Sequence, residues 1–372
     1  MAATITATRR VLVVGGGNCG LALALGLQKA RIPYTLFERD GEGDFLNRSR
    51  DWDMLLHWGD EYLRKLIPKR LHGRLNEATV DPDYNFKSNE RLPQLDADTG
   101  EIMRYVEMPL LTRMSRKRLR MFLIREQNLN IKFGKRVTRA DLDSTDEVSL
   151  DFEDGSRVQG ACIIGCDGSR SRMRDFLCGA KAKPEQVDLT MINHVARYPA
   201  KVAKTIRMQM HHPIVQLGFS KEQVATLLAD SQERLRYYRE RASKLCEPYR
   251  TAALALTDNE LLPVDREQQW SPFPWDNRGG KVTLAGDADI RCFLVNRGQG
   301  LKNAVKDASE LVDALTAVYK GQKCLEEAIA SYEAEMIPRG ANEIRLTQLV
   351  AEKRRDMKNN DPMILKGLQK AE

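Results

Sequence analysis

The 372-residue sequence lacks any run of 18 apolar residues, so we expect no helix that spans a membrane. Its seven cysteines include no CxxC pair, and Cys162 and Cys166 have no second cysteine or histidine pair at zinc spacing. We therefore expect reduced thiols and no metal site. The first apolar run, residues 11–14, is too short for the core of a signal peptide. Together these absences predict a soluble protein of the cytoplasm.

Charge of one sign is not concentrated in any segment. The net charge is +7, but basic residues occur in scattered pairs such as Arg9-Arg10 and Arg354-Arg355, and no basic tail is present. Because no basic stripe is visible, we expect no nucleic-acid partner. A weakly basic enzyme that handles anionic cofactors would explain the net charge at least as well as nucleic-acid binding would. The length and the 42% of apolar residues suit two packed domains.

Near the N-terminus the sequence predicts a strand, a glycine-rich turn, a helix and a second strand. The run VLVV at residues 11–14 is typical of a central parallel strand, and GGGNCG follows it directly. The glycines that match G-x-G-x-x-G are Gly15, Gly17 and Gly20. The second strand, residues 34–37, ends in Glu38. This order of elements predicts a dinucleotide-binding βαβ unit, and by itself it does not decide between FAD and NAD.

Each part of this unit has a physical role. Gly15 permits the tight turn, Gly17 lets the backbone approach a pyrophosphate, and Gly20 lets the helix lie close to the strand. The helix N-terminus then presents free N–H groups and the positive end of its dipole to the phosphates. Glu38 is the acidic residue expected to accept hydrogen bonds from the ribose hydroxyls.

A second motif follows an apolar strand at residues 161–164. The sequence GCDGSRSRMR, residues 165–174, resembles the GADGxxSxVR segment of group A flavin hydroxylases, with Cys166 in place of the alanine. The resemblance implies that this segment borders both FAD and the route of the nicotinamide nucleotide. We expect Asp167 and Arg174 to hold the turn through a charge-assisted hydrogen bond.

A third motif begins after the strand expected at residues 282–285. Here Gly286-Asp287 and, further on, RGQG at residues 297–300 resemble the family's GDAAH…P…GxGxN motif. The helix that follows has a 3.6-residue apolar period formed by Ala304, Val305, Ala308, Leu311, Val312 and Leu315. The resemblance implies that Asp287 accepts a hydrogen bond from the ribityl chain. It also implies that backbone N–H groups near Gly298, Gly300 and Leu301 point at the N1–C2=O edge of the flavin, where the reduced form carries negative charge.

The resemblance covers roughly residues 8–345, so the chain is similar to FAD-dependent group A aromatic hydroxylases of the para-hydroxybenzoate hydroxylase type. It implies an α/β fold, in which a Rossmann-type FAD-binding domain carries an inserted, mostly antiparallel substrate domain. The expected FAD-binding domain comprises residues 1–75, 112–182 and 277–355, the substrate domain residues 76–111 and 183–276, and a tail residues 356–372.

The resemblance also assigns arginines to the cofactor. Arg116 fits the R-x-x-L helix start whose arginine contacts FAD, with Arg118 as the alternative. A second arginine, after the second strand, is expected to reach the pyrophosphate. Arg48 and Arg50 both fit that position and Arg50 is preferred, while Arg39 is a further expected contact beside Glu38. For each of them the alternative is a solvated surface arginine.

The third motif departs from the family in the loop after Asp287. Asp289 and Ile290 stand where the family has alanine and histidine, and no proline occurs between Asp287 and Gly300. Proline fixes φ and removes an N–H, so its loss changes the wall beside the isoalloxazine. This departure from the family motif affects the expected formation and protection of a flavin C4a-hydroperoxide more than it affects FAD binding. It motivates the alternative of an FAD-bound enzyme that catalyses a non-oxygenating isomerase or cyclase step.

The expected substrate layer contains β-like runs at residues 187–197 and 205–210 and a helical stretch around 221–246. Its apolar members are Met108, Met191, Met208, Met210, Phe219, Trp270, Phe273 and Trp275. Methionine adapts to irregular apolar shapes, so an aromatic or polycyclic substrate fits, although each of these residues also suits a plain β-layer core.

The sequence names no catalytic base. His194 and Arg197 have opposite parity on the expected strand, so they cannot both face the flavin, and Arg197 is only a weak catalytic candidate. The expected reaction requires no catalytic base from the protein, because the cofactor carries the difficult chemistry. At the C-terminal end, an amphipathic helix that starts near Leu325 is expected to stop at Pro338.

The resulting hypothesis is an FAD-dependent monooxygenase. NAD(P)H would reduce the flavin, and O₂ would then supply the oxygen that hydroxylates or epoxidises an apolar, aromatic or polyketide-like small molecule. The resemblance implies a role in secondary metabolism. The oligomeric state, the choice between NADPH and NADH, and the identity of the substrate are left open by the sequence.

Overall fold

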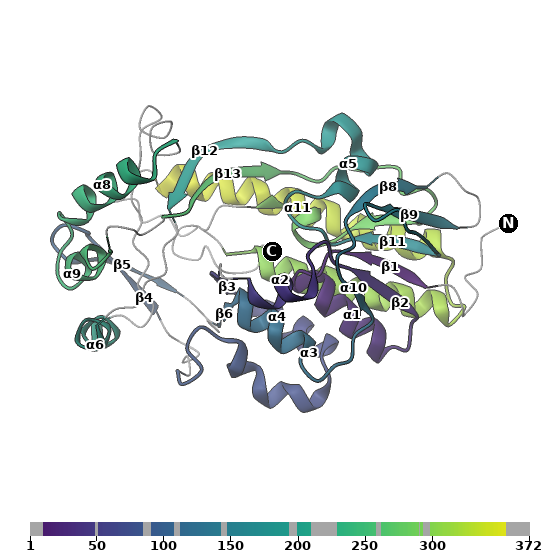
Figure 1. The fold of residues 1–372 in the computed structure, drawn as a ribbon, viewed down its shortest axis with the longest axis horizontal. Coiled ribbons are helices and arrows are strands. Elements are labelled where there is room, and N and C mark those ends of the chain that lie inside the picture. Colours follow the sequence, from purple (N-terminus) through teal and green to yellow (C-terminus); the bar gives the residue numbers. More distant parts are fainter. Residues whose placement is uncertain are drawn as a thin grey trace.

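A central parallel sheet carries the nucleotide-binding motifs (Figure 1). The computed structural model describes residues 10–48, 51–84, 91–107, 112–142, 147–192, 199–209, 229–257, 262–289, 291–292 and 298–354. The sheet has five strands, and all neighbours run parallel. In spatial order they are β14 (Val282–Leu284), β11 (Cys162–Gly165), β1 (Val11–Val14), β2 (Tyr34–Phe37) and β7 (Ile131–Lys132). Segments far apart in the sequence therefore end at one edge of one sheet.

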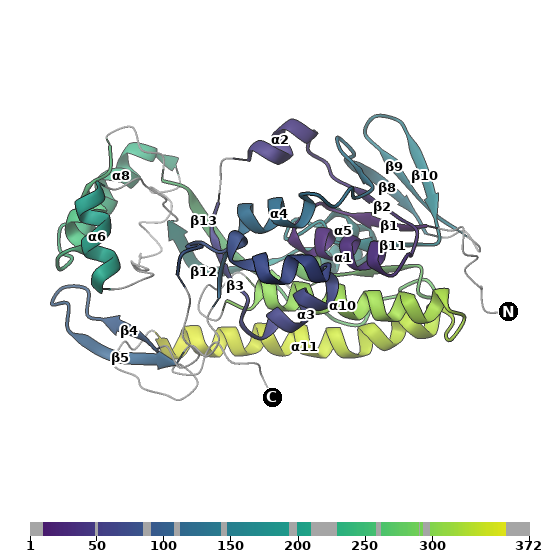
Figure 2. The same cartoon turned by 90° about the horizontal axis from the view of Figure 1, so that it is seen from below.

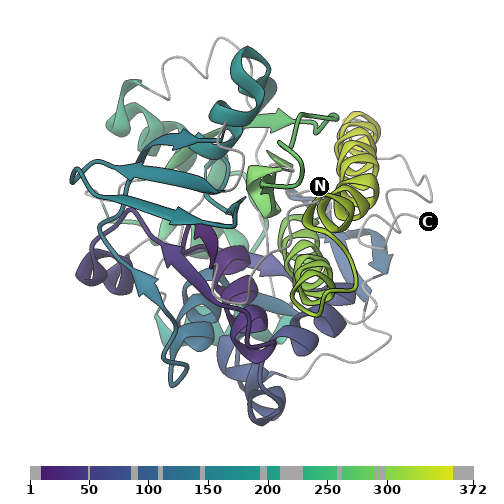
Figure 3. The same cartoon turned by 90° about the vertical axis from the view of Figure 1, so that its right-hand side faces the viewer.

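Helices cover one face of this sheet. Val11 and Val13 of β1 point into the core that these helices share, because alternate residues of a strand face opposite sides. The helices are α1 (Asn18–Lys29), α3 (Asp60–Leu66), α4 (Arg116–Ile124), α10 (Gly300–Tyr319) and α11 (Leu325–Arg354). Helix α11 packs along α10, as the end view shows (Figure 3).

An antiparallel sheet covers the other face (Figure 2). Its strands are β8 (Val137–Asp141), β9 (Val148–Phe152) and β10 (Arg157–Gly160). Leu12 and Val14, the other alternate residues of β1, pack into this second core together with Met173 of helix α5 (Arg172–Cys178). Both faces of the parallel sheet are therefore buried, which explains the wholly apolar runs in its strands.

Several shorter elements lie between the longer ones along the chain. They are helix α2 (Glu42–Asn47), the antiparallel pair β3 (Asp53–Leu55) and β6 (Arg113–Ser115), and the 3-10 segments η1 (His57–Gly59), η2 (Lys69–Ala78), η3 (Gly179–Ala182) and η4 (Gly286–Ala288). Strand β3 leads the chain from α2 to α3, and β6 leads it into α4.

The second layer lies at the far end of the molecule from β10 (Figures 1 and 2). Its larger sheet joins β12 (Glu185–Ile192), β13 (Val264–Trp270) and β15 (Arg291–Cys292), and its smaller sheet pairs β4 (Arg91–Leu95) with β5 (Ile102–Glu107). The strand pairs in both sheets are antiparallel. The helices α6 (Ala200–Gln209), α8 (Ser231–Ala242) and α9 (Tyr249–Leu254) complete it. The α/β fold class with a mostly antiparallel second layer is confirmed.

Two sequence-based expectations about single elements are wrong. Residues 205–209 belong to α6 and not to a strand, because the helix-forming alanine, lysine, arginine, methionine and glutamine residues outweigh the alternating pattern. Helix α11 does not stop at Pro338 but continues to Arg354. Met336 before the proline and Ile344 after it are both buried, so packing on both sides maintains the helix despite the missing N–H.

No helix in the described ranges has both the length and the apolar character that crossing a membrane requires.

Candidate functional site

The glycine turn between β1 and α1 is closed toward the sheet and open at its outer side. Gly15 has a φ of +108°, and a Cβ atom there would lie 2.4 Å from the carbonyl oxygen of Cys166. A Cβ atom at Gly20 would lie 2.0 Å from the carbonyl oxygen of Gly15. A Cβ atom at Gly17, in contrast, would have no neighbour within 4 Å. The turn is thus compact where it meets the sheet and leaves space over the backbone of Gly17.

Glu38 is fixed across this turn from the end of β2. Its side chain is buried, and Oε2 accepts a hydrogen bond from the backbone N–H of Gly16 at 2.8 Å. Oε1 accepts from the N–H of Asp40 at 3.0 Å and from Nη2 of Arg48 at 3.2 Å. The carboxylate therefore joins the first and second strand ends, in the position expected of the residue that binds the ribose.

Three arginines gather beside the glycine turn. Arg116, at the start of α4, stacks on the ring of Trp52 at 4.4 Å. Arg120, one turn further along α4, is buried over the ring of Phe45 at 4.5 Å and donates to the carbonyl oxygen of that residue at 2.7 Å. Arg48 completes the group from the end of α2.

The charges in this arginine group repel one another. Burial first, and then the cations of Arg48 and Arg120, lower the pKa of Arg116 to about 10, whereas the carboxylates of Asp287 and Asp51 act in the opposite direction. Burial and Arg48 likewise lower the pKa of Arg120. Nε of Arg48 already donates to Oδ2 of Asp40 at 2.7 Å, and Arg120 is buried, so an anion at this place would be met chiefly by Arg116. The charge of Asp287 acts on Arg116, so the third motif lies near the arginine group.

Arg120 was not among the residues predicted from the sequence. Its signal was available, because Arg116 and Arg120 are four residues apart and so share one face of a helix. Arg118, the alternative to Arg116, is exposed and donates to the carbonyl oxygen of Thr79 at 3.1 Å. The geometry therefore favours Arg116. The side chain of Arg39 is 54% exposed, and its Nε lies 3.7 Å from Oδ1 of Asp40.

The Gly286-Asp287 loop meets the N-terminus of α10. A Cβ atom at Gly300 would lie 3.6 Å from Oδ1 of Asp287, and one at Gly286 would lie 3.0 Å from Cβ of Cys19 in α1. Gly298 has a φ of +56°, and its Cβ atom would lie 2.4 Å from Cδ1 of Leu55. Three sequence segments that lie far apart in the chain therefore converge. Leu301, in the first turn of α10, is buried behind them.

The second motif joins this arrangement in a way the sequence did not predict. Asp167 accepts hydrogen bonds from the N–H of Arg172 at 2.7 Å and of Met173 at 3.1 Å, so the predicted bond to Arg174 is wrong. The free amides of the first turn of α5 compete successfully for this carboxylate. Arg174 instead donates to three carbonyl oxygens, those of Ser169, Ala182 and Ala288. Burial raises the pKa of Asp167.

The expected burial of three cysteines is confirmed. Cys19, Cys162 and Cys166 are buried and free. Burial raises the pKa of Cys162 to about 12, so this thiol stays protonated. Among the residues that the structure describes, no group of three histidine, cysteine, aspartate or glutamate side chains is arranged to hold a metal ion.

The three aromatic candidates for the substrate layer belong to the protein core. Trp270 is buried, and its Nε1 donates to the carbonyl oxygen of Lys181 at 2.8 Å. Phe273 and Trp275 pack against Trp270, and Nε1 of Trp275 donates to Glu333 at 2.9 Å. For these residues the alternative of a plain core is the better interpretation.

Several predicted residues fall outside the part of the chain whose side chains are described. They are Arg50, Met108, Met191, His194, Arg197, Met208, Met210, Phe219 and Ile290.

The converging residues suit an extended anionic dinucleotide. The backbone of Gly17 is open to close approach by a pyrophosphate, the arginine group supplies positive charge, and Glu38 and Asp287 supply acceptors at either end. The N-terminus of α10 adds free N–H groups beside Asp287. The donor and acceptor set therefore fits FAD, which has a diphosphate flanked by hydroxylated chains.

Comparisons with known proteins agree with this fit. The model of the FAD binding domain family matches residues 8–347. The FAD-dependent monooxygenase cctM of Talaromyces islandicus is 31% identical over 365 residues, which cover 90% of both chains. The FAD-dependent monooxygenase phnB of Penicillium herquei is 30% identical over 371 residues, covering 90% of this chain and 88% of the relative.

Solved structures share the fold at lower sequence identity. Klebsiella pneumoniae HpxO, complexed with FAD and uric acid, has a TM-score of 0.68 at 20% identity, covering 97% of this chain and 92% of that one. The 2,6-dihydroxypyridine-3-hydroxylase of Arthrobacter nicotinovorans also has a TM-score of 0.68, at 18% identity and 98% coverage of both chains. The chain belongs to the FAD binding domain family and is an FAD-dependent monooxygenase of the group A type.

Proposed function

We propose that this enzyme uses NAD(P)H and O₂ to hydroxylate or epoxidise an apolar, aromatic or polyketide-like small molecule in secondary metabolism. One oxygen atom of O₂ enters the product, and the other leaves as water with the two electrons and one proton of NAD(P)H and a further proton from solvent. The observation that carries the proposal is the position of Asp287 of the third motif. A Cβ atom at Gly300, at the start of α10, would lie 3.6 Å from its Oδ1, and its charge acts on Arg116 of the arginine group.

Residues of the first motif would hold the adenosine and phosphate portion. Glu38 would accept from the ribose hydroxyls, and the open backbone at Gly17 would meet the pyrophosphate. Arg116 would contact the phosphates, while Arg48, which is paired with Asp40, and the buried Arg120 would add positive charge nearby. Binding would thereby relieve the mutual repulsion of the three guanidinium groups.

Residues of the third motif would hold the flavin portion. Asp287 would accept a hydrogen bond from the ribityl chain, and the first amides of α10, at Gly300 and Leu301, would face the N1–C2=O edge. A helix N-terminus favours negative charge, so this arrangement would stabilise the reduced cofactor. When bound, FAD supplies the electron transfer and oxygen chemistry, while the protein orients it and limits the access of water.

The substrate class is supported by the antiparallel layer beside the site and by the family resemblance. That layer suits a roof over a flat cofactor, since its strands present alternate side chains to one side. The related proteins from Talaromyces islandicus and Penicillium herquei, both called FAD-dependent monooxygenases, support oxygenation over a step without oxygen transfer.

The proposal is tested with purified enzyme that has been loaded with FAD. We expect oxidised-flavin absorbance, NAD(P)H consumption that increases with a suitable aromatic or polyketide substrate, and a product heavier by one oxygen atom. With ¹⁸O₂ the added oxygen should carry the label. A product of unchanged mass would instead support an isomerase or cyclase step. Asp287→Ala should lose FAD, whereas Asp276→Ala, at an exposed aspartate of a neighbouring loop, should retain it.

A further inference from the structure

A buried ion pair joins α11 to the segments proposed to bind the flavin. In α11, Nη2 of Arg339 lies 2.6 Å from Oδ1 of Asp307, which is fully buried in α10. The same guanidinium donates from Nη1 to Oδ1 of Asn303 and from Nε to Oε1 of Glu335 at 3.0 Å. Each nitrogen of the planar group therefore has its own acceptor, a pattern that the single ammonium of a lysine does not reproduce.

The two residues that Arg339 holds in α10 continue to the proposed cofactor segments. Oδ2 of Asp307 accepts a hydrogen bond from the N–H of Gly286 at 2.9 Å, directly before Asp287. Nδ2 of Asn303 donates to the carbonyl oxygen of Gln299 at 3.0 Å, between Gly298 and Gly300. The guanidinium of Arg339 is thus linked through one side chain, Asp307, to the Gly286-Asp287 loop, and through another, Asn303, to the start of α10.

The Gly286 backbone needs such support. Its φ is +66°, and the neighbouring Cys19 lies so close that a Cβ atom at position 286 would be 3.0 Å from the Cβ of that cysteine. Asp307 fixes the direction of the Gly286 amide, and Arg339 fixes Asp307. Because an unpaired buried carboxylate is costly, Asp307 keeps its geometry only with its partner. Burial lowers the pKa of Arg339, but Asp307 and Glu335 together raise it well above the ordinary value, so the guanidinium remains charged.

We infer that Arg339 is a positioning residue for FAD binding, which acts through Asp307 on the Gly286-Asp287 loop and through Asn303 on the start of α10. This inference rests on the proposed roles of Asp287 and α10. It predicts that a residue of α11, outside every cofactor-binding motif, controls the affinity for FAD. In the end view, α11 lies along α10 (Figure 3).

The test measures the dissociation constant of FAD by fluorescence titration of the flavin-free protein, together with the melting temperature before FAD is added. Arg339→Gln should weaken FAD binding by about tenfold or more, as loss of an indirect ligand-orienting contact commonly does. Arg345→Gln, on the exposed side of the same helix, should change it by less than about twofold. Arg339→Lys should recover only part of the affinity.

Two comparison variants separate positioning from general destabilisation. Glu333→Ala removes another buried partner on α11, which accepts from Thr283 and Asn277 but not from Gly286 or α10. It should lower the melting temperature and leave the FAD affinity nearly unchanged. Asn303→Ala keeps the ion pair between Arg339 and Asp307 but removes the side chain that links Arg339 to Gln299. It should therefore still weaken FAD binding, and it serves as the deciding variant if Arg339→Gln does not fold.

Asp287→Ala, measured in parallel, distinguishes a failure of the positioning role of Arg339 from a failure of the proposed FAD site. If Asp287→Ala weakens FAD binding while Arg339→Gln and Asn303→Ala do not, the positioning role of Arg339 is overturned and the proposed site stands. If Asp287→Ala also binds FAD as the wild type does, the proposed site itself is wrong. The inference would also be overturned if Glu333→Ala changed the FAD dissociation constant and the melting temperature as much as Arg339→Gln does.

Discussion

The guanidinium of Arg174 donates a hydrogen bond to the carbonyl oxygen of Ala288 at 3.1 Å. The turn after β11 is thereby joined to the loop that carries Asp287. Arg174 is buried and has two further carbonyl acceptors, Ser169 and Ala182, so it holds three chain segments together. Its function is architectural, and it places one proposed cofactor segment relative to the parallel sheet.

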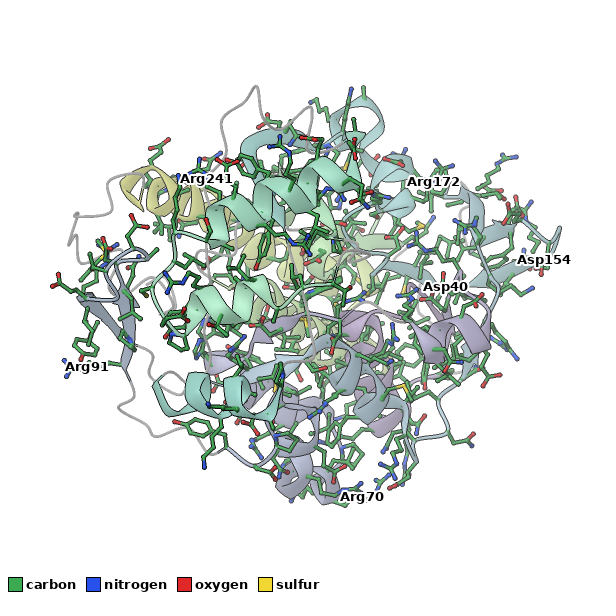
Figure 4. All side chains as sticks on the ribbon, turned by 60° about the vertical axis from the view of Figure 1, so that its left-hand side comes forward. Asp40, Arg70, Arg91, Asp154, Arg172 and Arg241 are labelled. Carbon is green, nitrogen blue, oxygen red and sulfur yellow. The ribbon has the colours of Figure 1, made fainter. Side chains whose placement is uncertain are left out.

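Arg174→Gln should therefore destabilise the fold. The glutamine is too short to reach all three carbonyl oxygens, and leaving buried acceptors unsatisfied is expected to cost about 3 kcal/mol of unfolding free energy. Arg172→Gln is the matched control, because Arg172 lies two residues away on the same short helix with an exposed side chain (Figure 4). Urea denaturation measures both. Equal stability of the two variants would contradict the architectural role.

The two glycines of the turn should respond differently to a methyl group. At Gly17 a Cβ atom has open space, so Gly17→Ala should fold normally and weaken FAD binding, because the methyl group would occupy the proposed path of the pyrophosphate. At Gly20 a Cβ atom would lie 2.0 Å from a backbone oxygen, so Gly20→Ala should lower the melting temperature of the flavin-free protein. A Gly17→Ala variant with wild-type FAD affinity would show that the phosphate does not approach here.

Replacement of Glu38 should affect the cofactor more than neighbouring acidic residues do. Glu38→Ala removes the acceptor for the Gly16 amide and the proposed ribose contact, so we expect the FAD dissociation constant to rise by about tenfold to a hundredfold. Glu42→Ala, at an exposed position of α2, is the control and should have no such effect. Equal FAD titrations of the two variants would remove Glu38 from the site.

Glu333 should make a distinct contribution to the pH dependence of stability. Burial raises its pKa, although hydrogen bonds from Thr283, Asn277 and Trp275 partly oppose the shift. A carboxyl whose pKa is higher in the folded state is favoured there in its protonated form, so its contribution to stability is lost as the pH rises through the interval between the unfolded and folded pKa values.

This contribution is isolated by comparing the wild type with Glu333→Gln. The unfolding free energy of the wild type minus that of the variant should fall as the pH rises from about 4 through the folded-state pKa, since the variant does not titrate. Urea denaturation at a series of pH values measures the difference. A difference that is constant or that rises with pH would contradict the raised pKa.

Local patterns predicted most of the architecture. The apolar runs of β1 and β11 and the spacing of Gly15, Gly17 and Gly20 depend on short-range geometry, and the structure reproduces the elements they predict. The period of the helix after Gly300 likewise gave α10. Such patterns work because strand alternation, helix period and tight turns are set within a few residues.

Features that depend on tertiary contacts were missed. Arg339 and Asp307 are far apart in the sequence, so nothing local shows that they form a buried pair. Residues 205–209 alternate like a strand but belong to α6, and α11 passes through Pro338 because its packing persists on both sides. The hydrogen bonds of Asp167 and Arg174 are similarly decided by which backbone groups the fold leaves free.

The central claim is that the glycine turn, the arginine group and the Asp287 loop together hold one FAD molecule. A crystal structure of the FAD complex measures this directly. The account predicts the pyrophosphate over Gly17 and beside Arg116, the adenosine ribose at Glu38, and the flavin against Asp287 and the start of α10. FAD bound elsewhere, or with its phosphates remote from Gly17 and Arg116, would contradict the account.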